Sequence, residues 1–184
     1  MKVYKIVPAS YAALRPRNPQ AFERAVGLNA FIGRPMLARW ELFDFDPEEP
    51  QQLETDFFYF GLGGLAFPQR TLDVFKSLFE RVGEVLPFTI SGDRFHALNV
   101  LRRVDCLDIS RSEVRRLPSG QVLKIDRYAF HSLPLEKESL FSIPQEVSTL
   151  FSVSETAETS LDFFRAYGDE GMTGLTFEQV YLDD

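Results

Sequence analysis

Residues 71–101, TLDVFKSLFERVGEVLPFTISGDRFHALNVL, decide the fold, because a helical pattern passes there into two strand patterns. Over residues 71–84, large apolar side chains recur every three or four positions while charged ones occupy the other face. The apolar residues are Leu72, Phe75, Leu78, Phe79 and Val82. Candidate strands follow at 87–90 and 95–101, with Ser91-Gly92-Asp93 supplying a turn between them. We therefore expect a helix followed by a hairpin.

Further strands are predicted on both sides of this stretch, where short apolar runs are bounded by turn residues. These runs lie at 57–60, 104–109, 141–143, 150–153 and 175–181. Pro118-Ser119-Gly120 predicts the turn of another hairpin, because Leu123 and Ile125 alternate with charged residues on its far side. Helices separated by several strands, without regular strand-helix-strand alternation, are typical of an α+β fold with a mixed or antiparallel sheet.

Ser154 is placed to cap a second main helix, since Glu155 and Glu158 fall in its first turn. The apolar face of this helix consists of Ala157, Leu161 and Phe164. Gly168 and Gly171 follow and are suited to end it. The sequence therefore predicts two main helices.

The length of 184 residues fits one domain, 1–184, with a substantial apolar core. Prolines interrupt the segment 13–54 too often for a long element to form there. They are Pro16, Pro19, Pro35, Pro47 and Pro50. We expect a loop-rich N-terminal subregion over 1–56 and the core of the fold over 57–184.

Composition narrows the class of protein. A hydrophobic content of 45% and a charged content of 26% are those of an ordinary globular chain and exclude disorder. Cys106 is the only cysteine, so no intramolecular disulfide can form and a reducing compartment is expected. We find no secretory signal and no run of membrane-spanning length, which predicts a cytoplasmic protein without a membrane partner.

The net charge of −7 is unevenly distributed along the chain. Residues 1–39 hold seven basic side chains and one acid, whereas 41–56 hold seven acids and neither Lys nor Arg. An acidic surface disfavours nucleic acid and suits a basic protein partner, because complementary potentials favour encounter. The alternative is that the acidic balance serves solubility alone.

The segment 40–56 mixes aromatic and acidic residues between prolines, a composition suited to protein interfaces. We predict a partner-binding site formed by Trp40, Glu41, Phe43, Asp44, Asp46, Glu48, Glu49 and Glu54. The alternative is a solvated loop in which Trp40 and Phe43 pack into the core.

Gly61-Leu62-Gly63-Gly64-Leu65-Ala66 fits the dinucleotide-binding pattern G-x-G-x-x-G/A and follows a predicted strand. A helix beginning in that motif would place Pro68 beyond its first turn, where proline disrupts a helix. A simple glycine turn is therefore favoured. A small-molecule or nucleotide-binding enzyme that uses Gly61–Ala66 stays an alternative, as does a regulatory ligand-binding module with a Phe-lined pocket.

His96, Asp105, Cys106 and Asp108 are the residues that could gather a metal or a nucleophile-base pair. On an extended strand, Asp105 and Asp108 point to opposite faces and cannot share an ion. We therefore expect no catalytic residue, no metal and no cofactor. An aspartate or serine within 108–112 is expected to bind the backbone donors of a turn instead.

Six blocks in one order resemble a family of bacterial immunity proteins encoded beside polymorphic toxins. The blocks are LPF at 86–88, FHALNVL at 95–101, VDCLDISRS at 104–112, LFSIP at 140–144, LFSVS at 150–154 and GMTGLTFEQV at 171–180. The resemblance covers roughly residues 55–182 and implies inhibition of a cognate toxin by tight complex formation, without catalysis or cofactor. It assigns no binding residue, because the shared motifs resemble core segments.

Overall fold

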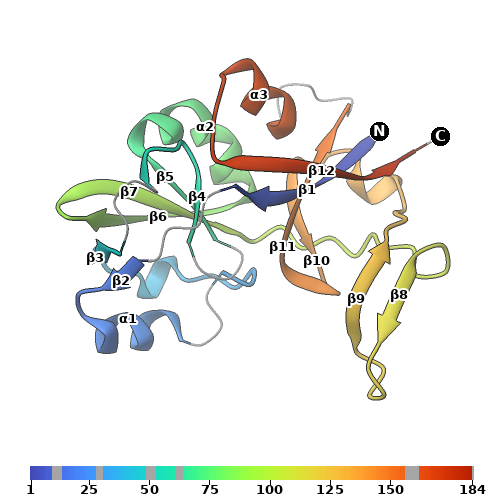
Figure 1. Ribbon diagram of the computed structural model, residues 1–184, viewed down its shortest axis with the longest axis horizontal. Helices are drawn as coiled ribbons and strands as arrows, with labels where there is room; N and C mark the ends of the chain where they lie inside the picture. The colour runs from blue at the N-terminus through green and yellow to red at the C-terminus, as the bar shows by residue number, and fades with distance from the viewer. Residues whose placement is uncertain (10–13, 28–30, 49–52, 61–63, 156–161, 184) are drawn as a thin grey trace.

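The computed structural model describes residues 1–9, 14–27, 31–48, 53–60, 64–155 and 162–183. It is an α+β structure in which a six-stranded and a four-stranded sheet lie next to each other (Figure 1). A two-stranded hairpin projects beyond them at one end of the molecule. The predicted fold class is thereby confirmed.

The segment that decides the fold forms a helix and a hairpin, as predicted. Helix α2 spans Gln69–Val82, and strand β6, Gly83–Ile90, begins at the next residue. Strand β7, Asp93–Val100, returns antiparallel to β6 through a turn at Ser91 and Gly92, both with positive φ. Phe75, Leu78, Phe79 and Val82 of α2 are buried, because the apolar face of the helix lies on the sheet.

The six-stranded sheet is mixed and has the strand order β2-β3-β6-β7-β5-β4. The strands are β2 Leu14–Pro16, β3 Phe43–Pro47, β4 Phe58–Tyr59 and β5 Leu65–Pro68, together with β6 and β7. Strand β3 is parallel to β6, and every other neighbouring pair is antiparallel.

The four-stranded sheet is antiparallel and has the order β10-β11-β1-β12. Its strands are β1 Lys2–Pro8, β10 Leu140–Ile143, β11 Glu146–Ser154 and β12 Leu175–Leu182. Lys2 is opposite Leu182, so the two ends of the chain lie side by side in the sheet (Figure 1).

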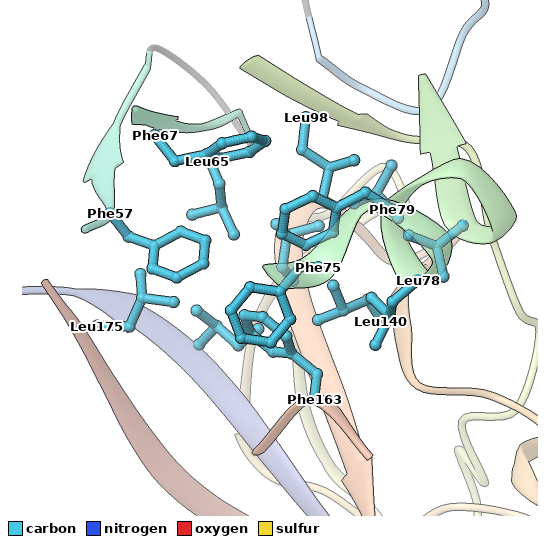
Figure 2. Close-up of a cluster of buried hydrophobic side chains, with 14 residues drawn as sticks. Phe57, Leu65, Phe67, Phe75, Leu78, Phe79, Leu98, Leu140, Phe163 and Leu175 are labelled. Carbon is cyan, nitrogen blue, oxygen red and sulfur yellow. The ribbon is translucent and has the colours of Figure 1, made fainter. Parts of the chain in front are cut away.

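One buried apolar cluster contains residues from both sheets and from helices α2 and α3, the latter Phe163–Asp169 (Figure 2). Leu65 and Leu98 come from the six-stranded sheet, and Leu140 and Leu175 from the four-stranded one. Phe163 at the start of α3 packs against Phe75 of α2, with ring centroids 5.2 Å apart. The two sheets therefore share a hydrophobic core.

A second contact between the sheets joins the segment before β4 to the segment before β12. The amide N of Phe57 donates to the carbonyl of Thr173 at 3.0 Å. The carboxylate of Asp56 accepts from the amide and the hydroxyl of Thr173 at 2.9 and 2.8 Å. Gly174 lies so close that an added Cβ would be 1.9 Å from the carbonyl oxygen of Phe57.

The N-terminal subregion contains more regular structure than the sequence predicted. Helix α1, Pro19–Val26, is a third helix, and a 3₁₀ turn at Leu37–Arg39 precedes strand β3. Pro19 is the first residue of α1, and the Asn18 side chain accepts from the amide of Ala21 at 3.1 Å. The proline therefore begins a helix here, because its fixed φ suits that position.

Segment 104–109 is not a strand, contrary to prediction. One isolated bridge lies within it, at Leu107 with Phe130, and another just before it, at Arg103 with Ser142. Its backbone bonds change partner along the segment: Val104 N donates to Ser142 O, and Asp108 N donates to Ala129 O. No continuous ladder can form when the partner changes within so few residues.

The second predicted helix begins later than expected, at Phe163, and Ser154 is not its cap. Ser154 ends strand β11 opposite Lys2, and its hydroxyl donates to Asp162 at 2.6 Å. Asp162 is the cap, since its side chain accepts from the amide of Arg165 at 2.9 Å. The predicted helical residues Ala157, Glu158 and Leu161 lie outside the described residues. Among the described residues, no helix is long and apolar enough to cross a membrane.

Candidate protein-interaction site

The β8–β9 hairpin, residues 113–127, projects beyond the two larger sheets at one end of the molecule (Figure 1). Strands β8, Glu113–Arg116, and β9, Val122–Arg127, pair antiparallel and form a separate two-stranded sheet. The turn at Pro118-Ser119-Gly120 confirms the predicted hairpin. Its amides are satisfied locally, since Leu117 N donates to Gln121 O and Gly120 N to Leu117 O, each at 2.8 Å.

The base of the hairpin is anchored in a buried apolar cluster. Ile125 of β9 is buried there beside Tyr128 and Phe130, and Val114 and Val122 pack against the same cluster. The hydroxyl of Tyr128 donates to Glu146 at 2.7 Å, which ties the end of the hairpin to strand β11. The hairpin therefore has a fixed origin on the four-stranded sheet.

Ion pairs connect the two strands of the hairpin. Arg115 binds the carboxylate of Asp126 through two nitrogens, at 2.5 and 2.8 Å, and Lys124 contacts the same carboxylate at 2.9 Å. Arg127 pairs with Glu113 at 3.0 Å. The Arg115 hydrogen bond, followed by that of Lys124, lowers the pKa of Asp126 to about 2. The carboxylate therefore stays ionised and the cross-strand contacts persist through the neutral range.

Two leucines are exposed on this element. The residue exposures are 40% for Leu117 next to the turn and 61% for Leu123 on β9. An anchored hairpin with exposed apolar side chains beside cations has the chemistry of a protein-binding surface. Although the turn was predicted, this site was not, because sequence alone does not show that the hairpin projects. The four cations and two acids of residues 113–127 are the sequence feature that could have indicated this site.

The predicted acidic site is only partly available for contact. Phe43 is a buried strand residue, 6% exposed, so its ring is not presented to a partner in this structure. Trp40 is half-buried, and its indole N–H donates to the carbonyl of Pro87 at 2.7 Å. The two rings pack against each other with centroids 5.2 Å apart. The alternative in which both aromatics belong to the core describes them better.

Most of the described acids of that site are paired within the chain. Arg17 contacts Asp44 and Asp46, each at 2.7 Å, and Arg15 contacts Glu48 at 3.1 Å. The hydrogen bond from Arg17 lowers the pKa of Asp46. Strand β2 lies beside β3, so the basic segment lies against the acidic one and the sequence-level charge separation is lost in space. Glu41 and Glu54 are exposed, and Glu49 lies outside the described residues.

The glycine motif does not lead directly into a helix. Residues 61–63 lie outside the described part of the chain, but Leu65 and Ala66 belong to β5, which pairs antiparallel with β4 and β7. Helix α2 starts only at Gln69, after this strand. A dinucleotide site needs the motif to open a helix, so the described residues lack that context.

Cys106, His96 and Asp108, candidates for a metal or nucleophile site, are buried or bound to backbone amides. Cys106 is buried, and burial raises the pKa of its thiol to about 12, which leaves it protonated. His96 is buried in β7, and burial lowers the pKa of its imidazole. Asp108 accepts from the amides of Ser110 and Arg111 at 3.0 and 3.2 Å, which confirms the predicted turn. Within the described ranges, no three of His, Cys, Asp or Glu are grouped to hold a metal.

The surface also carries an aromatic cleft of about 580 Å³ beside helix α3. Phe164, Tyr167 and Phe177 contribute its rings, with ring centroids 5.0–5.1 Å apart between Phe177 and each of the other two. Glu155 and Asp162 lie at the same cleft. It is a place where a small aromatic molecule could bind.

Comparison of the chain with known protein families gave no match, and no curated protein sequence matched it.

Proposed function

We propose that this protein is an immunity protein that binds a cognate bacterial toxin in the cytoplasm and blocks it by forming a complex. The observation that carries the proposal is the anchored β8–β9 hairpin, on which Leu117 and Leu123 are exposed to solvent. In this proposal the chain acts by binding and needs no catalytic group or cofactor of its own.

The construction of the hairpin favours binding. The buried Ile125 and the ion pairs across the strands restrict its conformation before it meets a partner. Little conformational entropy is then lost when the partner docks, so more of the contact energy appears as affinity. An exposed leucine in such an element gains hydrophobic energy only when another surface covers it.

The blocks that resemble the immunity family lie in the core of the fold and not in the hairpin. Leu86, Leu98, Phe141 and Phe151 each belong to one of these blocks and are completely buried. The blocks therefore supply the scaffold. The β8–β9 hairpin, at 113–127, lies between two of these blocks and belongs to neither.

The proposal is tested by expressing the toxin encoded beside this gene together with variants of the protein. Leu117→Thr and Leu123→Thr remove exposed apolar area, and Val74→Thr is the matched control, since Val74 on α2 is 42% exposed against 40% for Leu117. Wild type and Val74→Thr are expected to protect cells, and the double hairpin variant to protect poorly. Failure of the wild type to protect would refute the proposal. Equal protection by the hairpin variant would show that the hairpin is not part of the toxin-binding surface.

The aromatic cleft at Phe164, Tyr167 and Phe177 favours a second function, a regulatory module that binds a small aromatic molecule. A ligand present at about a hundred times its Kd stabilises the folded state by about 2.7 kcal/mol. Thermal denaturation with free tryptophan, tyrosine and indole tests this function. A shift that is lost in Phe177→Ala would support it, and unchanged melting with all three would count against it.

A further inference from the structure

The charge of the β8–β9 hairpin is opposite to that of the rest of the chain. Residues 113–127 hold four cations, Arg115, Arg116, Lys124 and Arg127, and two carboxylates. This segment therefore has a net charge of +2 in a chain of −7, which leaves −9 on the other residues. A cationic hairpin on an otherwise acidic protein produces an electric field that orients an approaching charged molecule.

The two carboxylates are both engaged inside the hairpin. Asp126 is shared by Arg115 and Lys124, and Glu113 pairs with Arg127. Arg116 differs, because its guanidinium donates to the carbonyl of Gly120 at 2.8 Å, next to the turn. The excess positive charge is thus located on the outer half of the hairpin, near Leu117 and Leu123.

We infer that the partner surface receiving this hairpin is an acidic protein surface with an apolar contact for the two leucines. This inference rests on the proposed function and reverses the sign expected from the acidic segment at 41–56, whose Asp44, Asp46 and Glu48 are paired with Arg17 and Arg15. Carboxylates on the partner would pair with Arg116 and Lys124, and an apolar recess would receive Leu117 and Leu123.

A protein fits this surface better than nucleic acid does. A polyanion would gain contacts from four cations but would also meet the field of nine net negative charges on the remaining residues. Phosphate groups also give nothing in exchange for the exposed apolar area of Leu123, which is 61% accessible. An acidic protein surface can supply both kinds of contact.

The test compares two variants that change the net charge equally. Arg116→Gln removes a cation from the hairpin, and Arg24→Gln removes an exposed arginine from α1. Neither breaks the pairs of Asp126 or Glu113. Association with the purified toxin encoded beside the gene is followed by stopped-flow fluorescence at low and high salt, with a labelled DNA duplex and a labelled RNA as separate probes.

At low salt, Arg116→Gln is expected to associate about threefold more slowly than Arg24→Gln, and the difference should vanish near 1 M salt, where the Debye length is about 3 Å. Equal rates for the two variants, or a faster rate for Arg116→Gln, would overturn the acidic partner. Binding of either nucleic acid, weakened by Arg116→Gln, would overturn it in favour of a polyanion. Wild type that neither binds nor neutralises the toxin would instead refute the proposed function, and the inference with it.

Discussion

The close approach of Gly174 to Phe57 gives a quantitative prediction about how the two sheets are joined. Both Gly174 and Gly92 have positive φ, +98° and +93°. A Cβ on Gly92 meets nothing within 4 Å, whereas one on Gly174 would be 1.9 Å from the Phe57 carbonyl oxygen. Gly92→Ala therefore reports the backbone strain alone, and Gly174→Ala reports the strain together with the collision.

The two costs can be estimated separately. An alanine forced to positive φ costs about 1–2 kcal/mol, which is the expectation for Gly92→Ala. A carbon normally stays about 3.3 Å from a carbonyl oxygen, so Gly174→Ala must push the two backbones apart by about 1.4 Å. Overpacking of this kind costs about 1–3 kcal/mol, and loss of the Thr173 bonds to Phe57 and Asp56 adds about 1 kcal/mol. We expect a total of about 4 kcal/mol for Gly174→Ala.

Thermal and urea unfolding, both followed by circular dichroism, compare the Tm and the free energy of unfolding of both variants with those of wild type. In a chain of this size each kcal/mol lowers Tm by about 2–4 °C, so Gly174→Ala should melt roughly 8–16 °C below wild type. Gly92→Ala should lie within about 8 °C of wild type. Equal losses in the free energy of unfolding for the two variants would show that Gly174 does not pack against Phe57, and so that the segments at 53–57 and 171–175 are not in contact.

Three further outcomes follow from the packing and the charges. The Cys106 thiol should react with Ellman's reagent only as fast as the protein unfolds, because it is buried with its pKa raised to about 12, and rapid reaction at pH 8 would contradict this. The Asp126 carboxyl should titrate near pH 2 in carbon-13 spectra. Because its pKa is lower in the folded state than the ordinary value near 3.9, it stabilises the fold above that pH, and this stabilisation is lost as the pH falls toward 2. A titration midpoint near 4 would show that the Arg115 pair is absent in solution. Phe163→Ala should lower the free energy of unfolding by about 3–5 kcal/mol in urea, and a loss below about 1 kcal/mol would mean that the shared cluster is not packed around this ring.

The elements that sequence predicted well are those whose signals are local. The α2 helix and the β6–β7 hairpin follow from apolar periodicity and from the Ser91-Gly92 turn, all within one continuous stretch. Helix α1 is not predicted, because Pro16 and Pro19 indicate a break in regular structure, although Asn18 is a cap and Pro19 suits the first helical position.

The errors share a dependence on residues far apart in the chain. Ser154 and Asp162 are both suited to cap a helix, and the choice falls to Asp162 because Ser154 pairs with Lys2 at the other end of the chain. The acidic site was predicted from charge along the sequence, and pairing of β2 with β3 brings Arg15 and Arg17 to those acids. Neither the helix cap nor the pairing of the acids can be predicted from neighbouring residues in the sequence.

Hydrogen exchange of the purified protein, alone and mixed with the toxin that we propose as its partner, tests whether the β8–β9 hairpin is the binding surface. We expect a stoichiometric complex in which amide exchange slows across residues 113–127, with little change at Phe43–Pro47. A complex that protects Phe43–Pro47 and leaves the hairpin unchanged, or the absence of a complex, would contradict this expectation.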